Sequence, residues 1–225
     1  MVKRFAVIGL GYFGQNIARE LTRQGAEVIA IDNTMLKIEE IKDEVAYAVR
    51  LDSTDEKTLR NQALEDLDAV IVSIGEDFDN SLLTCVLLLE FGCKNVIAKS
   101  TSPIHSRIFR SVGVHQVVSP DLDLAGRLAV TLVKPNVLDS VPLTDEYSIV
   151  QMRAPSYMVG FTLKDLDLRR KYNVNLITIK RSLVPTGGVL TEQIIGVPMP
   201  ETMIEANDIL ILMGEHKSIG KLTEA

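Results

Sequence analysis

Short apolar runs alternate with amphipathic segments through the first 120 residues of the chain. Runs of this length that are rich in Val, Ile and Ala are typical of buried β-strands, and the segments between them have helix-like patterns. This alternation predicts an α/β fold, with a parallel sheet that is doubly wound in the Rossmann manner and covered by helices on both faces. The six expected strands are residues 5–8, 28–31, 46–49, 69–72, 96–98 and 116–118.

The pattern changes after the sixth strand. A helix is predicted over residues 122–133, and the proline at position 135 should end it. The remaining residues predict several strands and a short charged helix, which together are typical of a small α+β domain. We therefore expect two domains, at residues 1–134 and 135–225. The later elements are expected at residues 147–152, 163–172, 174–179 and 209–213.

Three glycines with the spacing Gly-x-Gly-x-x-Gly directly follow the first strand. Gly9 permits a tight turn, Gly11 lets the backbone approach a phosphate, and Gly14 lets the following helix pack on the strand. That helix, expected at residues 15–24, offers free N–H groups and a positive dipole end to an anion. The second strand ends on Asp32, which is placed to accept hydrogen bonds from ribose hydroxyls. Strand, turn, helix and acid together predict a nucleotide-binding site.

Polar residues follow the third strand at its carboxyl end, where a doubly wound sheet binds the distal part of its ligand. Asp52 is placed to reach an adenine or ribose edge. The alternative is a local role, in which Ser53 or Thr54 caps a helix over residues 56–61. The two interpretations are compatible, and the sequence leaves both open.

The fourth and fifth strands end at the same edge of the sheet. Ser73, Ile74 and Gly75 end the fourth strand, and the small residues leave room for backbone to face a ligand. Lys99 ends the fifth strand and suits a phosphate as a point charge, with a plain solvated lysine as the alternative.

The helix expected around residues 81–90 is apolar nearly all round. Such a helix is buried on more than one side, so its own sheet and a neighbouring subunit are expected to cover it. Simple burial in the core is the competing interpretation.

Composition narrows the possible partners. The chain has 225 residues, 46% of them hydrophobic, which is enough for a buried core. Its formal charge of −6 and its lack of a basic stripe argue against a nucleic-acid partner.

Cys85 and Cys93 have no nearby histidine to complete a metal site, so we expect reduced, partly buried thiols of a cytosolic protein. The apolar run after Lys3 and Arg4 has only strand length, so no secretory leader is expected. The longest apolar stretch, residues 86–89 with their neighbours, is too short for a membrane span.

The sequence offers little for catalysis on a bound nucleotide. A dehydrogenase needs a proton donor or acceptor beside the nicotinamide and a domain that encloses its substrate. His105, His115 and His216 are scattered and lack a carboxylate partner in sequence, so we interpret them as surface or structural residues. The sequence has no G-x-S-x-G, HExxH or CxxC motif. We therefore expect a nucleotide sensor and not an enzyme.

Segments along the whole chain resemble the RCK family, also called KTN, the cytosolic regulatory subunits of Ktr and Trk potassium-uptake systems. The resemblance is closest to the KtrA type and includes both its TrkA-N (RCK_N) and TrkA-C (RCK_C) domains. It implies that the first domain binds ATP, ADP or NAD(H). It also implies dimers that assemble into an octameric gating ring under a membrane-embedded, potassium-translocating subunit of the KtrB or TrkH type. The similar segments are FAVIGLGYFG, LDSTDE, VIVSIGEDFDNSLLT, VVSPDLDLAGRLA, NVLDSVPLTDEYSIV, DLDLRRKYNVNLITIKR and ETMIEANDILILMG.

The resemblance implies a role for each residue of the expected site. The glycines of the turn would hold phosphates, Asp32 the ribose, Asp52 and Ser53 the adenosine end, and Lys99 the phosphate tail. No catalytic residue is implied. The implied nucleotide-binding set is Gly9, Gly11, Tyr12, Phe13, Gly14, Asp32, Asn33, Asp52, Ser53, Ile74, Gly75 and Lys99.

Two positions depart from the family pattern. KtrA-type proteins usually carry an arginine within the glycine motif that reaches the terminal phosphate across the dimer, whereas this chain has Tyr12. A neutral phenol cannot replace a guanidinium fork, so the basis for preferring ATP over ADP is lost and NAD(H) or AMP gains as the regulatory ligand. The family glutamate that holds a divalent cation between neighbouring nucleotides in some members is Asp121, which is one methylene shorter. A metal at Asp121 is an expectation of the resemblance.

The second domain resembles modules that bind cyclic di-AMP at a symmetric dimer cleft in some Gram-positive members. Arg169 and Asn175 lie in the segments that contribute to that cleft. The alternative interpretations of these residues are a solvated helix charge and a turn residue.

We interpret the chain as a nucleotide-gated regulatory ring subunit on the cytoplasmic face of the plasma membrane. Ligand exchange would change which ring geometry is favoured, and the ring would transmit that preference to the transporter. The alternatives are a small NAD(P)-dependent oxidoreductase and a free-standing sensor of NAD or cyclic di-AMP.

Overall fold

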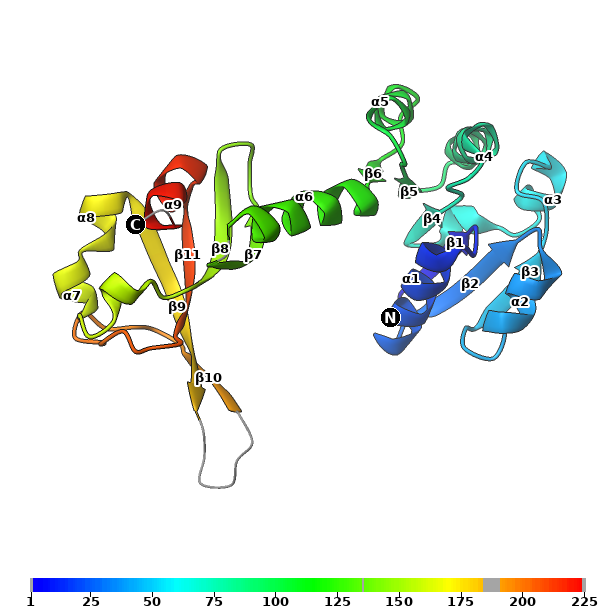
Figure 1. Ribbon diagram of the computed structural model, residues 1–225. Coiled ribbons are helices and arrows are strands. Elements are labelled where there is room, and N and C mark those ends of the chain that lie inside the picture. Colours follow the sequence, from blue (N-terminus) through cyan, green and yellow to red (C-terminus); the bar gives the residue numbers. More distant parts are fainter. Residues whose placement is uncertain (1, 135, 184–190, 224–225) are drawn as a thin grey trace. The chain divides into compact units, whose positions relative to one another are not determined.

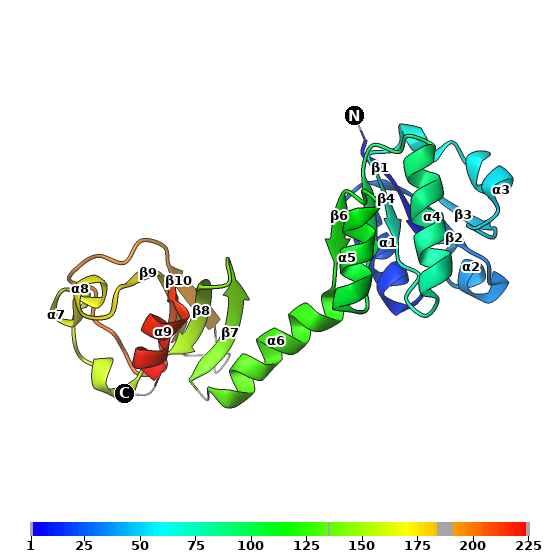
Figure 2. The same ribbon diagram turned by 90° about the horizontal axis from the view of Figure 1, so that it is seen from above.

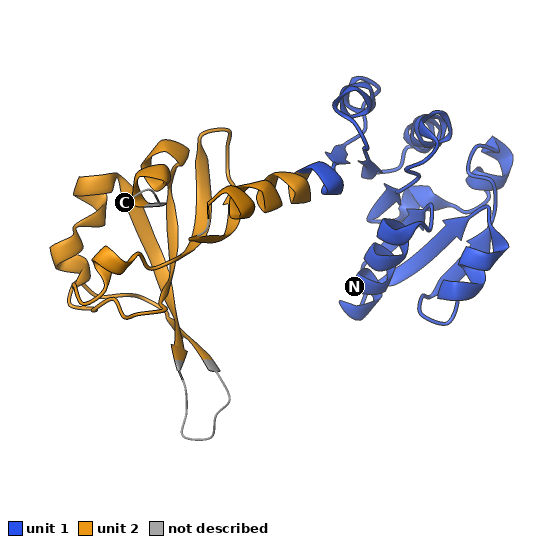
Figure 3. Cartoon of the chain, in the orientation of Figure 1, with its two compact units in different colours: residues 1–122 blue, residues 123–225 orange. Residues whose placement is uncertain are grey.

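The computed structural model describes residues 2–134, 136–183 and 191–223 of the chain. The chain forms two compact units, residues 1–122 and 123–225, each with a hydrophobic core of its own (Figure 3). The proline at position 135, where the sequence predicts the domain boundary, lies outside the described residues. Within the described ranges, no helix is both long enough and apolar enough to cross a membrane.

Six strands form the centre of the first unit: β1 (Arg4–Ile8), β2 (Glu27–Asp32), β3 (Tyr47–Arg50), β4 (Ala69–Val72), β5 (Val96–Lys99) and β6 (Gln116–Val118). Neighbours pair in parallel in the order β3-β2-β1-β4-β5-β6 (Figures 1 and 2). This is the doubly wound Rossmann order, so the predicted fold class is confirmed. Because the strand order reverses between β1 and β4, the carboxyl ends of these two strands border the place where such folds bind their ligands.

The helices of this unit are α1 (Tyr12–Arg23), α2 (Met35–Ile41), α3 (Glu56–Arg60), η1 (Leu64–Asp66), α4 (Phe78–Glu90) and α5 (Pro103–Ser111). Side chains alternate along β1, so that Val7 shares a core cluster with α1 and α2. Ala6 and Ile8 share another cluster with α3, α4 and α5. Helices therefore cover both faces of the sheet, as the near-continuous apolar strands predicted.

Two helices differ from their predicted form. Helix α1 begins at Tyr12 and not at residue 15, with Gly11 as its N-cap. In α4, Thr84, Cys85 and Leu88 are fully buried against the sheet, whereas Leu83 is 44% exposed. The core thus covers one side of α4, and cover by a neighbouring subunit stays a prediction.

Helix α6 (Pro120–Val133) follows β6, and the division between the two units falls within it. The second unit then contains β7 (Val137–Pro142), β8 (Tyr147–Arg153), η2 (Ser156–Met158), α7 (Leu163–Leu166), α8 (Leu168–Tyr172), β9 (Val174–Leu183), β10 (Thr191–Ile195), β11 (Ile209–Glu215) and α9 (His216–Thr223). Its strands pair antiparallel in the order β10-β9-β11-β8-β7 (Figure 1). Met152, Leu210 and Leu212 are central to its core, and α9 adds Ile219 and Leu222. The predicted small α+β domain is confirmed.

One helix of the second unit differs from its prediction. The segment expected as a single helix over residues 163–172 is two helices, α7 and α8, because Asp167 between them has a left-handed backbone with φ of 41°. Aspartate is one of the few residues besides glycine that tolerate this conformation. The hydrophobic pattern also did not indicate β7, β10 or α9.

A buried ion pair joins β9 to the residues before β11. The side chain of Asp208 is fully buried, and its two oxygens accept hydrogen bonds from Nε and Nη2 of Arg181, each at 2.8 Å. The backbone N–H of Glu205 donates to the same carboxylate at 2.8 Å, and Arg181 also donates to the carbonyl of Met203 at 2.9 Å. The carboxylate is therefore both paired and enclosed within the fold.

Candidate functional site

The turn after β1 requires glycine at two of its three glycine positions. Gly9 has a left-handed backbone with φ of +91°, and a Cβ on it would lie 2.9 Å from the backbone nitrogen of Ile74. A Cβ on Gly14 would lie 1.9 Å from the carbonyl oxygen of Gly9. Only glycine therefore lets the chain turn this tightly and lets the first turn of α1 pack against the end of β1. The turn and the packing roles predicted for Gly9 and Gly14 match this geometry.

Gly11 lies in a different environment. Its φ is −69°, and a Cβ on it would meet none of the described atoms within 4 Å. Directly after it, α1 begins with amide groups that have no acceptor inside the helix. Tyr12 in this first turn is 91% exposed, and the buried hydroxyl of Ser73 beside the turn has no hydrogen-bond partner among the described residues. An accessible helix N-terminus with a free buried hydroxyl beside it fits the phosphate of a nucleotide.

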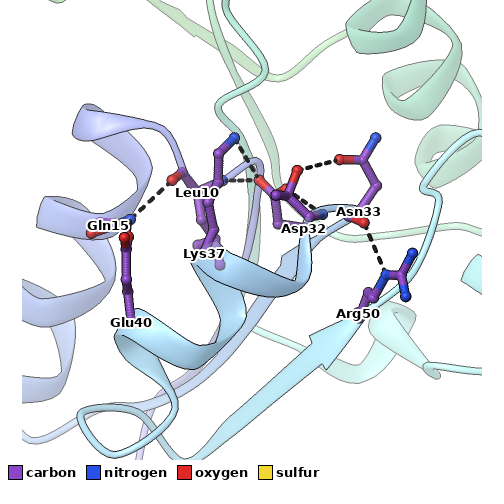
Figure 4. Close-up of polar contacts among 8 residues, drawn as sticks. Leu10, Gln15, Asp32, Asn33, Lys37, Glu40 and Arg50 are labelled. Atoms are coloured by element: carbon purple, nitrogen blue, oxygen red, sulfur yellow. Dashed lines mark hydrogen bonds and ion pairs between the residues drawn. The ribbon is translucent and has the colours of Figure 1, made fainter.

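Asp32 at the end of β2 is 6% exposed and faces the glycine turn (Figure 4). One carboxylate oxygen accepts a hydrogen bond from the backbone N–H of Leu10 at 2.7 Å and contacts Nζ of Lys37 at 3.2 Å. The other accepts from the backbone N–H of Thr34 at 2.8 Å. Burial opposes ionisation of the carboxyl, but these N–H donors and the ammonium outweigh it and lower the pKa of Asp32. The group is therefore a fixed carboxylate beside the turn.

Further hydrogen bonds hold the turn and the loop after β2 in place (Figure 4). Gln15 donates to the carbonyl of Leu10 at 3.2 Å and to the carboxylate of Glu40 at 2.8 Å. Arg50 donates to the carbonyl of Asn33 at 3.1 Å, which leaves the Asn33 side chain exposed at the rim. The glycine turn and the loop after β2 are thus held in place by the fold itself.

The residues after β3 divide into exposed and buried groups. Asp52 is exposed, and one of its oxygens accepts from the backbone and the hydroxyl of Thr54. The hydroxyl of Ser53 is buried and bonded to that of Thr84 at 2.8 Å. The predicted cap is wrong, because Asp55 and not Ser53 or Thr54 caps α3 by accepting from the backbone N–H of Thr58.

Lys99 lies at the opposite half of the same sheet edge. Its side chain is only 16% exposed, so it is not the freely solvated lysine of the alternative interpretation. Its Nζ lies 3.9 Å from the position that a Cβ on Gly75 would take and 5.6 Å from the centre of the Phe13 ring. It also lies 3.4 Å from Oδ2 of Asp121. The structure therefore brings Lys99 together with the end of β4 and the first turn of α1.

The other expected ligand groups are more isolated. Among the described residues, no cluster of three or more His, Cys, Asp or Glu side chains is arranged to hold a metal ion, and Asp121 faces Lys99 instead. Arg169 is an exposed residue of α8. Asn175 pairs with Met213 within the sheet, so the interpretation of Asn175 as a turn residue is wrong.

Each histidine has a structural contact. His105 stacks on Phe78 with ring centres 3.9 Å apart, and His115 accepts a hydrogen bond from the backbone N–H of Val96 at 3.0 Å. His216 lies 3.3 Å from the Ser148 hydroxyl. The two cysteines are buried thiols, and burial raises the pKa of Cys85 to about 12 and that of Cys93 to about 11, which suppresses their reactivity.

Two residues at the site, Lys37 and Thr84, escaped the sequence analysis, and Ser73 was singled out only for its small size. Lys37 pairs with Asp32, and its position in the first turn of the helix after the acid is a signal that the sequence does contain. Thr84 holds Ser53 from a helix 31 residues away, and Ser73 presents the free hydroxyl beside the glycine turn. No spacing rule indicates the contact between Thr84 and Ser53 or the free hydroxyl of Ser73.

The geometry defines a class: a Rossmann-type α/β unit with a turn and acid of the dinucleotide-binding kind, followed by a small α+β unit. The model of the TrkA-N domain matches residues 5–120, and that of the TrkA-C domain matches residues 148–225. The chain belongs to the family defined by these two domains, and the resemblance to RCK proteins is confirmed.

The chain matches potassium-uptake proteins over nearly its whole length. It is 38% identical to the Ktr system potassium uptake protein C of Bacillus subtilis (strain 168), over 98% of this chain and 96% of that protein. It is 34% identical to protein A of the same system, over 96% of this chain and 94% of that protein. The predicted membership among Ktr-type potassium-uptake subunits is therefore confirmed.

Solved structures share the fold. The RCK domain of GsuK superposes with a TM-score of 0.67 at 16% identity, over all of this chain and 47% of that chain. The NAD(P)-binding domain of an exopolyphosphatase-related protein from Archaeoglobus fulgidus is 31% identical, with a TM-score of 0.51 over 58% of this chain and 97% of that one.

Proposed function

We propose that the chain is a nucleotide-binding regulatory subunit of a potassium-uptake system. It acts on the cytoplasmic face of the membrane, bound to a membrane-embedded, potassium-translocating subunit of the KtrB or TrkH type. The observation that carries the proposal is the glycine turn, in which Gly11 is open to a ligand while Gly9 and Gly14 are enclosed. The Ktr relatives support the potassium-uptake context.

The ligand is an adenine nucleotide or NAD(H). Gly11 and the start of α1 bind its phosphates, Asp32 and Asn33 the ribose, Asp52 and Ser53 the adenosine end, and Lys99 the distal part. Ile74 and Gly75 form the floor beside the turn. The similarity to an NAD(P)-binding domain supports this assignment, as does a solved NAD-bound GsuK channel of the same fold.

The subunits assemble into dimers and then into an octameric ring, whose geometry responds to the bound nucleotide. A ligand shifts such an equilibrium only by its difference in affinity for the two ring states. Two finer assignments belong to the same proposal: cyclic di-AMP near Arg169 and Asn175, and a divalent cation held by Asp121 from neighbouring subunits.

Binding is tested with a thermal-shift panel of ATP, ADP, AMP, NAD, NADH and cyclic di-AMP, because a ligand of the folded state raises its stability. The informative variant is Gly11→Ala, whose Cβ has room within the fold but faces the ligand. We expect it to weaken binding about tenfold, as for a lost hydrogen bond to a charged group. Gly126→Ala, in a helix position with similar room, is the matched control. Equal shifts in wild type and Gly11→Ala would contradict this site.

The departure at Tyr12 has its own test. Because Tyr12 is exposed and neutral, ATP and ADP should give similar shifts in wild type. Tyr12→Arg should favour ATP, since a guanidinium binds a terminal phosphate in a bidentate manner. Tyr12→Phe is the matched control, and a Tyr12→Arg variant that leaves the ATP to ADP ratio unchanged would refute the role of this position.

Similarity to an NAD(P)-binding domain also makes an oxidoreductase the second candidate. It predicts consumption of NADH with a small substrate and a particle no larger than a dimer. A ring with the mass of eight copies of the 24.8-kDa chain would argue against it. A free-standing sensor is excluded if deletion of the chain abolishes potassium uptake.

A further inference from the structure

The ion pair between Lys99 and Asp121 lies where the distal end of a nucleotide would arrive. Lys99 is largely buried, and its Nζ is close to both Gly75, three residues after β4, and Phe13 in the first turn of α1. Asp121, in contrast, is the second residue of α6 and has a side chain that is 75% exposed. The fold thus holds the Lys99 side chain in place, whereas the exposed Asp121 side chain has room to move away from it.

The pair also sets the charge of this half of the site. Lys99 is the residue suited to a phosphate here, and Asp121 neutralises it at 3.4 Å. Tyr12, the exposed residue at the neighbouring helix start, adds no charge. At the other half of the site, Asp32 already pairs with Lys37. A ligand with a charged terminal phosphate near Lys99 must therefore compete with the Asp121 carboxylate for the lysine. Neither Tyr12 nor Lys37 offers that phosphate a second unpaired positive charge.

From this geometry we infer that Asp121 is a specificity-determining residue of the nucleotide site. It competes with the terminal phosphate of the ligand for Lys99. When no divalent cation is bound, it therefore selects against ligands that place a terminal phosphate there, such as ATP and ADP, relative to AMP, whose one phosphate lies at the glycine turn, and NADH, whose far end is a nicotinamide riboside. The inference rests on the proposed function, because it assumes that a nucleotide lies with its phosphates at the glycine turn.

Competition is measured by calorimetric titration of the full chain with ATP, ADP, AMP and NADH in the presence of a chelator, so that divalent cations do not contribute. We expect Asp121→Asn to bind ATP and ADP about two- to fivefold more tightly than wild type, the range of a partly exposed ion pair. Affinities for AMP and NADH should change by less than about twofold on the same scale. The gain should shrink at high salt, because one partner is exposed.

Two variants make the result specific. Asp123→Asn makes the same charge change on the same helix, at an exposed aspartate that forms no ion pair with any described residue, and should leave all affinities unchanged. In a Lys99→Gln background the gain from Asp121→Asn should become smaller, since the competition is for Lys99. Equal gains in both backgrounds, equal gains for all four ligands, or the same gain from Asp123→Asn would each overturn the inference.

The proposed function and this inference would be contradicted by different results. If wild type binds none of the four ligands, the proposed function is wrong and this inference with it. If wild type binds them and Asp121→Asn does not change the ranking, only the inference is wrong. Asp121 is mostly exposed, so Asp121→Asn is expected to fold, and an unchanged melting temperature without ligand checks this.

Discussion

Two buried aspartates, one in each unit, show how the same group can serve either the structure alone or a proposed binding site. Asp208 in the second unit is enclosed by Arg181, which binds both of its oxygens, and by the N–H of Glu205. Asp32 in the first unit receives two backbone N–H groups and a single, longer contact from Lys37. Asp208 has no exposed surface, whereas Asp32 lies at a sheet edge beside the open Gly11.

The two carboxylates differ in the groups that balance their charge and in their position in the fold. Each carboxylate has three contacts, two at one oxygen and one at the other. The bidentate Arg181 encloses Asp208, whereas backbone N–H groups keep Asp32 ionised and oriented at a sheet edge, where its remaining acceptor position lies beside the open Gly11. Asp32 is therefore preorganised to accept further donors, such as ribose hydroxyls, and Asp208 is not.

The largest expected effect is from Asp208→Asn, which removes the buried counter-charge of the mostly buried Arg181 guanidinium and leaves it only the exposed Glu205. Breaking such a pair costs about 3–5 kcal/mol. Hydrogen exchange should show this loss of protection in β9 and β11 but not in β1 and β2, because the units have separate cores. Glu205→Gln removes an exposed partner of the same arginine and should cost no more than about 1 kcal/mol. Equal losses from both variants would contradict this view of Asp208.

Asp32→Asn should have a smaller effect on stability and a large one on binding. An amide NH₂ in place of a carboxylate oxygen faces an N–H donor, so one backbone donor loses its acceptor at a cost of about 1–3 kcal/mol. Nucleotide affinity should fall about tenfold or more. Hydrogen exchange in β1 and β2 measures the first quantity and calorimetry the second. Unchanged affinity would show that Asp32, like Asp208, has only a structural role.

Acid provides a third test of the same carboxylate. The folded pKa of Asp32 is lower than its ordinary value of 3.8, so its contribution to stability is present above that value. The contribution is lost as the pH falls through the folded pKa. As the pH falls below about 4, wild type should therefore lose more stability than Asp32→Asn, as measured by urea denaturation. Parallel pH curves for the two proteins would contradict the assignment.

The smallest effect is expected at Asp52, the exposed acid at the end of β3. Asp52→Asn retains an oxygen for the Thr54 contacts, so stability should change by no more than about 0.5 kcal/mol. Its effect on nucleotide affinity should be smaller than that of Asp32→Asn, because Asp52 is less fixed and more hydrated. Urea denaturation and calorimetry give the two values. A larger binding loss at Asp52 than at Asp32 would reverse the proposed roles.

The sequence predicted most closely what depends on local pattern. The strands of the first unit and the glycine turn follow from apolar runs and from conformations that only glycine adopts, as at Gly9. The break at Asp167 was not predictable from periodicity, because the residues on both sides fit one helix. Nor did the sequence indicate β7, which ends in a proline that a strand tolerates at the edge of a sheet.

Contacts between residues far apart in the sequence could not be predicted from the hydrophobic and polar pattern. Lys99 and Asp121 are each visible as strand-end and helix-start residues, but only the fold shows that they pair. The same holds for Arg181 and Asp208, which pair across 27 residues of chain. Sequence thus located the edge of the sheet where the site lies, and the structure was needed to show which of its charges are already used.

Potassium uptake tests the central claim most directly. A strain that lacks the chain is complemented with wild type, Gly11→Ala or Gly126→Ala, and potassium uptake is measured at matched protein levels. If the chain regulates uptake through a nucleotide at the glycine turn, wild type and Gly126→Ala should restore nucleotide-dependent uptake fully and Gly11→Ala should restore less of it. Restoration by Gly11→Ala as complete as by wild type, or normal uptake without the chain, would contradict the account.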